Sequence, residues 1–188
     1  MSGGTPAAIQ HEPELAGQTV VAIGGSAGSG LETARRARAE GAEVILTGRD
    51  PVRLSQPAKE VGAQRTATFA ATDTASLQRF FQDLPPPIDH VMVTAGGPVY
   101  GPLLQMDPAQ VRTALNDHIA LGLDVARNAA GKMRPAGTLV LIGGTGGRRV
   151  GHGLGIASAA TAALPPVRGG PRARTCPGSG QPYRRRLR

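Results

Sequence analysis

The feature that most constrains how this chain can fold is a glycine-rich loop between a short apolar run and a helical segment. The apolar run, TVVAI, covers residues 19–23, and the loop, GGSAGSG, covers residues 24–30. Residues 31–40 then carry apolar side chains on one helical face, and Gly41 follows as a helix-ending glycine. A continuous apolar run is typical of a strand buried on both faces of a parallel sheet. These segments predict the opening of an α/β domain.

The same alternation of strand-like and helical segments continues along the chain. Asp50 before Pro51, and Asp107 before Pro108, have the pattern of a capping residue followed by proline at the first helical position. A strand followed by a helix, repeated five times, predicts a doubly wound parallel α/β sheet. After the first unit we expect strands at residues 43–47, 66–70, 88–94 and 138–142, and helices at residues 51–61, 76–84, 108–133 and 154–164.

The charge of the chain is distributed unevenly. The formal net charge is +8, but residues 165–188 hold seven arginines and no acid, so residues 1–164 are nearly neutral. Aromatic residues make up only 3% of the chain, which argues against a protein that stacks single-stranded bases on aromatic rings. We therefore expect no specific nucleic-acid partner.

Cysteine content and hydropathy bear on the cellular compartment in which we expect the protein. Cys176 is the single cysteine, which excludes a disulfide framework or a cysteine-based metal site within one chain, and we expect no metal. The sequence has no run of 18 apolar residues, and residues 1–17 lack the basic and apolar regions of a secretory signal. We expect a cytoplasmic protein without a membrane partner.

The chain divides into three parts by composition. Residues 1–17 have the composition of a flexible lead-in, residues 18–164 of the folded domain, and residues 165–188 of a basic, disordered tail rich in Pro, Gly and Arg. The tail has three interpretations: a polyanion-binding segment, plain disorder, or the product of a frameshift near codon 165. The frameshift is favoured because Arg, Pro, Gly and Ala have GC-rich codons and the composition changes abruptly.

The glycine loop has the spacing Gly-x-x-x-Gly-x-Gly and opens a helix. One glycine permits a tight turn, a second lets the backbone approach a pyrophosphate, and a third allows the helix to pack close to the sheet. The helix N-terminus adds free N–H groups and a positive dipole. We predict a phosphate-binding loop whose contacts come from Gly24, Ser26, Gly28, Ser29 and Gly30.

Together with VMVTAGG at residues 91–97 and LIGGTGG at residues 141–147, this loop resembles the short-chain dehydrogenase/reductase family. The resemblance covers roughly residues 15–164. It implies a Rossmann-type sheet of order 3-2-1-4-5, with the family's last strands missing because residues 165–188 show no strand pattern. It also implies hydride transfer between a nicotinamide cofactor and a small-molecule carbonyl or alcohol, and a possible homo-oligomer.

The end of the second expected strand bears on the choice of cofactor. Arg49 follows this strand, where an acid usually holds a ribose without a 2′-phosphate, and a guanidinium suits a phosphate. This favours NADP(H) over NAD(H), although Arg49 can also be a solvated loop residue and Asp50 is an alternative acid. The resemblance adds four cofactor-binding residues, of which the first is the acid expected at the adenine: Asp73, Thr74, Ala95 and Gly96.

The catalytic residues that the resemblance implies are largely replaced. The family uses a Tyr as acid/base, a Lys four residues later, a Ser and an Asn. Ala157 and Thr161 fall at the Tyr and Lys positions, and the Ser position falls on Gly144 or Thr145. His118 lies near the Asn position. Thr145 and His118 are therefore the candidate catalytic residues, with packing on its helix as the alternative interpretation of His118.

The loop after the fifth expected strand holds further polar residues. His152, Arg148 and Arg149 can contact a substrate there or can be solvated loop residues. Three functional hypotheses follow: a divergent NADP(H)-dependent oxidoreductase, a non-catalytic NADP(H)-binding regulatory protein, and an inactive, frame-damaged relic.

Overall fold

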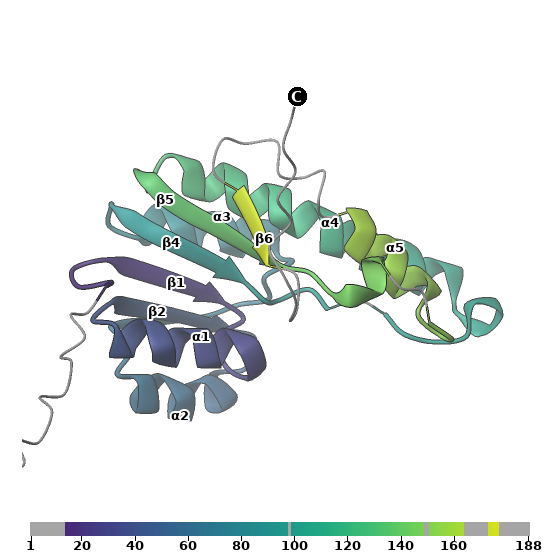
Figure 1. The fold of residues 1–188 in the computed structure, drawn as a ribbon, viewed down its shortest axis with the longest axis horizontal. Helices are drawn as coiled ribbons and strands as arrows, with labels where there is room; N and C mark the ends of the chain where they lie inside the picture. Colours follow the sequence, from purple (N-terminus) through teal and green to yellow (C-terminus); the bar gives the residue numbers. More distant parts are fainter. Residues whose placement is uncertain (1–13, 98, 149–150, 164–172, 177–188) are drawn as a thin grey trace, which may run out of the picture.

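A computed structural model describes residues 14–97, 99–148, 151–163 and 173–176. Its centre is a parallel sheet, and its helices lie on both faces (Figure 1). The strands are β1 (Thr19–Ile23), β2 (Glu43–Gly48), β3 (Arg65–Thr68), β4 (Ile88–Val93), β5 (Met133–Ile142) and β6 (Ala173–Cys176). The helices are α1 (Gly28–Ala39), α2 (Pro51–Val61), α3 (Thr74–Asp83), α4 (Pro108–Ala130) and α5 (Gly155–Ala163), with short 3-10 turns η1 (Leu103–Gln105) and η2 (Thr145–Gly147).

The strand order is β3-β2-β1-β4-β5-β6, and every pairing is parallel. The predicted α/β class and the order 3-2-1-4-5 are confirmed. The expectation that residues 165–188 contribute no strand is wrong for Ala173–Cys176, which pairs with Leu139–Ile142 of β5. An edge strand exposes unpaired backbone groups, and four residues suffice to pair with them without any periodic apolar pattern. The rest of the predicted tail, residues 165–172 and 177–188, lies outside the described residues, as do residue 164 of the predicted domain and most of the predicted lead-in.

The boundary between α4 and β5 differs from the prediction. The helix ends at Ala130 instead of Met133, and the strand begins at Met133, five residues before its expected start. Ile88 pairs with Met133 and His90 with Thr138, so the register shifts between these two pairs. The extra residues at the start of β5 are mostly exposed, which is why the apolar pattern did not reveal them.

Both predicted capping acids are confirmed. The Asp50 carboxylate accepts hydrogen bonds from the N–H groups of Val52 (2.8 Å) and Arg53 (3.2 Å) at the start of α2. The Asp107 carboxylate accepts one from the N–H of Ala109 (3.0 Å) at the start of α4. These bonds satisfy backbone donors that have no partner within the helix.

The apolar core has two layers, one on each face of the sheet. Alternate residues of β1 point to opposite faces, so Val20 and Ala22 pack with α1 and α2, while Val21 and Ile23 pack under α3 and α4. The second layer is larger and includes Phe80 and Phe81, whose rings meet edge to face. Burial of β1 on both faces explains its continuous apolar sequence.

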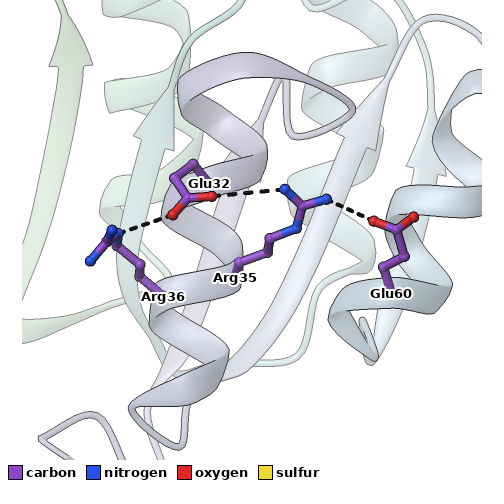
Figure 2. A network of polar contacts seen from close by, with 4 residues as sticks. All are labelled: Glu32, Arg35, Arg36 and Glu60. Carbon is purple, nitrogen blue, oxygen red and sulfur yellow. Dashed lines mark hydrogen bonds and ion pairs between the residues drawn. The ribbon is translucent and has the colours of Figure 1, made fainter.

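Polar contacts outside the core join elements that are distant in sequence. Figure 2 shows Arg35 of α1 paired with Glu60 of α2 (2.7 Å) and with Glu32, which also pairs with Arg36. At the amino end of the sheet, the ring nitrogens of His90 bond to the side chains of Gln18 and Thr138, each at 2.7 Å.

Candidate functional site

A cavity of about 750 Å³ opens at the carboxyl ends of the strands. It lies where the chain order reverses between β1 and β4, the place where open α/β sheets bind ligands. The sheet side of the cavity is formed by the ends of β1, β2 and β4 and by the segment after β3. Five residues predicted from the sequence line it: Gly24, Ser26, Arg49, Ala95 and Gly96.

The glycine loop admits no side chain at two of its positions. A Cβ on Gly30 would lie 2.5 Å from the carbonyl oxygen of Gly24, and a Cβ on Gly24 would lie 2.6 Å from the Thr94 hydroxyl. Gly24 also has φ of +93°, which glycine adopts without strain. The loop is therefore pressed against the end of β4, and its backbone forms the cavity wall.

Thr94 holds this loop to β4. Its hydroxyl donates to the carbonyl oxygen of Gly24 (2.9 Å), 70 positions earlier in the chain, and also lies 3.3 Å from that of Ile23. Thr94 lines the cavity as well. The sequence analysis did not predict this positioning role of Thr94.

The first turn of α1 contains the other predicted loop residues, Gly28, Ser29 and Gly30. The capping residue Ala27 makes no side-chain bond to this turn, and the turn contains no acid. The first N–H groups of a helix have no intrahelical partner, so this end suits an anion. These three residues adjoin the cavity in the chain but do not line it.

Arg49 lines the cavity directly after β2 and is exposed. Among the described residues, it makes no hydrogen bond or ion pair, so its guanidinium is available to a ligand. Asp73 and Thr74 do not line the cavity. Asp73 caps α3 instead, accepting from the N–H (3.2 Å) and the hydroxyl (2.7 Å) of Ser76, and these bonds lower the pKa of its carboxyl. Thr74 lies 3.5 Å from Asp124.

His118 lines a separate, small cavity of about 20 Å³ between α4 and the ends of β4 and β5. Its Nδ1 donates to the carbonyl oxygen of Gly96 (2.6 Å), because a carbonyl can only accept. Its Nε2 is buried and has no partner within the described part of the chain. His118 therefore fixes the Gly96 turn behind the large cavity and does not face into it.

The segment after β5 places few chemical groups near the cavity. Thr145 begins η2 and is exposed, but it does not line the cavity. Ala157 is 4% exposed, and the Thr161 hydroxyl donates to the Ala157 carbonyl oxygen within α5 (2.8 Å). His152 is exposed in the following loop.

Of the two arginines predicted to contact a substrate in this segment, the structure describes one. Arg148 is exposed, and Arg149 lies outside the described residues.

One wall of the cavity was not predicted. The first half of α4 contributes Gln110, Thr113, Ala114 and Asp117, whose spacing of three, one and three places them on one helical face. Ala71 and Thr72, after β3, close the adjoining side. The helical spacing of Gln110, Thr113 and Asp117 is visible in the sequence. Only the fold shows that these residues and the glycine loop line the same cavity.

The described residues contain neither a membrane-spanning helix nor a cluster of metal-binding side chains. None of their helices is both long and apolar enough to cross a membrane. They also contain no group of three or more His, Cys, Asp or Glu side chains arranged to hold a metal ion.

A parallel sheet with a glycine loop after its first strand, and a cavity at the point of reversed order, defines a nucleotide-binding α/β domain of the dinucleotide type. The family model described as short chain dehydrogenase matches residues 18–165. The chain belongs to this family.

Individual relatives agree with this assignment. A Streptomyces lividans protein named "Probable oxidoreductase" is 34% identical over 132 residues, which are 64% of this chain and 44% of that protein. The crystal structure of BdcA in complex with NADPH has a TM-score of 0.73 and 26% identity, over 80% of this chain and 62% of that one. A dehydrogenase/reductase from Sinorhizobium meliloti 1021 has a TM-score of 0.75 and 24% identity, over 81% and 64%. The chain therefore spans less than two thirds of these relatives.

Proposed function

We propose that this protein is an NADP(H)-dependent oxidoreductase that acts on a small carbonyl or alcohol, located in the cytoplasm. The single observation that carries the cofactor choice is Arg49, whose guanidinium has no partner among the described residues and lies in the wall of the cavity beside the glycine loop. A planar guanidinium binds a phosphate through two parallel hydrogen bonds, and the 2′-phosphate distinguishes NADP(H) from NAD(H). The similarity to BdcA, whose structure contains NADPH, supports the same choice.

The residues present fit such a cofactor. Gly24 and Gly30 keep side chains away from the place where a pyrophosphate would meet the backbone, and the first turn of α1 offers its free N–H groups. The cavity volume of about 750 Å³ is within the range of cofactor sites. When bound, the cofactor supplies or accepts a hydride.

The chain's own contribution to proton transfer is unusual. We assign Thr145, exposed at the start of η2 after β5, as the hydroxyl that hydrogen-bonds a substrate oxygen. His118 acts through the Gly96 carbonyl oxygen that it holds, as a positioning residue of the cavity wall.

A non-catalytic NADP(H)-binding function is the second candidate. It is favoured by the buried, apolar Ala157 at the position of the family's acid/base. An inactive relic, with no cofactor binding, is the remaining alternative.

A fluorescence titration of the full chain with NADPH and with NADH tests the proposal. We expect tighter binding of NADPH, and Arg49→Asp should move the preference toward NADH by at least tenfold, because it replaces an attractive charge with a repulsive one. Arg53→Asp is the matched control, since Arg53 is exposed on α2 outside the cavity lining. An unchanged NADPH/NADH ratio in Arg49→Asp would show that the cofactor argument is wrong.

A screen of alcohols and ketones then separates the two binding functions. NADPH oxidation, or NADP reduction, with any of them supports the oxidoreductase. Tight NADPH binding without turnover on the whole panel supports the regulatory function instead. Circular dichroism of a sample that binds neither cofactor identifies the relic.

A further inference from the structure

Asp117 places a carboxylate in the helical wall of the large cavity. It is half-buried, and no hydrogen bond or ion pair engages it among the residues that the structure describes. A carboxylate in a cavity wall, with no partner among the described residues, is free to accept hydrogen bonds from a ligand. The position of Asp117 therefore carries information about the ligand.

We propose that Asp117 recognises the adenine ring of the cofactor by accepting a hydrogen bond from its 6-amino group. This inference rests on the proposed NADP(H) function and adds a residue that determines base specificity. Arg49, on the sheet side, marks the 2′-phosphate and therefore the adenosine end of the cavity. The base attached to that ribose then lies between Thr72 after β3, Gly96 after β4 and the face of α4 that carries Ala114 and Asp117.

Hydrogen-bonding chemistry indicates which group of the cofactor Asp117 can bind. A carboxylate only accepts hydrogen bonds, so it repels the phosphates and needs a donor. In this proposal Arg49, which directly follows β2, binds the 2′-phosphate, while Asp117 lines the cavity from α4. The 6-amino group is the donor that the adenine ring presents to the opposite wall.

The other acids near the cavity are already engaged. Both carboxylate oxygens of Asp73 bond to Ser76, and Asp73 is not part of the cavity lining. Asp50 caps α2, and Asp107, which lines the cavity, caps α4. Asp117 is the acid of the described cavity wall with both oxygens open to a ligand. The acid expected at the adenine after the third strand is thus replaced by one from α4.

The test compares NADPH with reduced nicotinamide hypoxanthine dinucleotide phosphate, in which a carbonyl oxygen replaces the 6-amino group. The wild-type chain should bind NADPH about tenfold more tightly, because a hydrogen bond to a charged acceptor is lost in the analogue. In Asp117→Asn the amide can donate to the carbonyl oxygen, so the preference should fall below about threefold. The matched control is Asp124→Asn, the same change two turns later in α4 and outside the cavity lining, which should keep the tenfold preference.

The outcomes are distinguishable. Equal binding of both dinucleotides by the wild type, or an unchanged preference in Asp117→Asn, overturns the role of Asp117 and leaves the NADP(H) function standing. Binding of neither dinucleotide by a sample with native circular dichroism overturns the proposed function, and the Asp117 inference with it. Because the readout is a ratio on one protein, a partly destabilised variant still gives a valid answer.

Discussion

The glycine loop after β1 and the segment after β5 are both rich in glycine, but the two regions are packed differently. In the loop, a Cβ on Gly24, Gly25 or Gly30 would lie 2.5–2.7 Å from its nearest neighbour. After β5, a Cβ on Gly144 or Gly146 would meet nothing closer than 3.6 Å. The first region accepts only glycine at Gly24 and Gly30, whereas at Gly25 the close neighbour is the flexible end of Leu46. The second region has room for a side chain at Gly144 and Gly146, although a Cβ on Gly147 would lie 3.0 Å from the backbone nitrogen of Ala162.

This difference shows where glycine is fixed by packing. At Gly24 and Gly30 the close neighbours are atoms of the loop itself and of Thr94–Ala95, so the tight fit is independent of any ligand. The family resemblance leads us to expect the groups that act on the substrate in the segment after β5. The positions expected for these groups are occupied by Ala157, Thr161 and an exposed Thr145. The glycine loop, where we propose that the cofactor binds, is thus the well-packed region, and the segment after β5 is the part to test.

The largest expected effect is that of Gly30→Ala. The added Cβ would overlap the Gly24 carbonyl oxygen and the Thr94 hydroxyl, so the free energy of unfolding should fall by about 1–3 kcal/mol. NADPH binding should weaken at least tenfold. Urea unfolding and a fluorescence titration measure the two effects. Gly146→Ala is the control and should stay within about 0.5 kcal/mol of wild type; equal losses in both variants would contradict the comparison.

Thr94→Val should have the next largest effect. The valine keeps the shape of the side chain but removes the donor to the Gly24 carbonyl oxygen, at a cost of about 1–2 kcal/mol in unfolding free energy. Because the glycine loop is then held less firmly, NADPH affinity should fall as well. Thr94→Ser keeps the hydroxyl and should recover most of both. If the serine variant binds as weakly as the valine variant, the hydroxyl is not what positions the loop.

Asp50→Ala should have a smaller effect, on the stability of α2 and on the cofactor preference that we attribute to Arg49. It removes the cap of α2, which costs about 1 kcal/mol in unfolding free energy. Since Arg49 precedes this cap directly, the preference for NADPH over NADH should also decrease. Asp50→Asn can still cap the helix and is the control. Thermal unfolding measures the loss of stability, and titrations with NADPH and NADH measure the preference. An unchanged NADPH preference in Asp50→Ala would show that the cap does not position Arg49.

The smallest effect is expected away from both regions, in the ion pair of Figure 2. The hydrogen bond from Arg35 lowers the pKa of the Glu60 carboxyl below its ordinary value of 4.5. A carboxyl whose pKa is lower in the folded state stabilises the fold above its unfolded pKa. This stabilisation should be present above pH 4.5 and lost as the pH falls through the folded value. Urea unfolding of wild type and Glu60→Gln at several pH values should therefore show a small difference that disappears in acid.

The sequence was sufficient to predict the parallel sheet and the glycine loop. Strands buried on both faces and a loop confined to glycine leave local patterns, and Asp50 and Asp107 cap their helices as their neighbouring prolines indicate. The sixth strand was missed because an edge strand needs only backbone groups. The start of β5 was missed because its first residues are exposed.

The candidate site was predictable only in part. Arg49 and the loop residues follow from their positions after strands. Asp73 caps α3 through Ser76 and is not part of the cavity lining, which the motif alone did not indicate; its contact with the adenine stays a prediction. Asp117 and Thr94 act across distances that no local pattern contains, and the role of Thr145 remains a proposal.

His90 sits at the opposite end of the sheet, where its ring joins Gln18 before β1 to Thr138 in β5. The two bonds span 72 and 48 positions of sequence, so they exist only while β1, β4 and β5 are in register. The two hydrogen bonds of the His90 ring therefore report whether these three strands are in register, at a place outside the cavity lining.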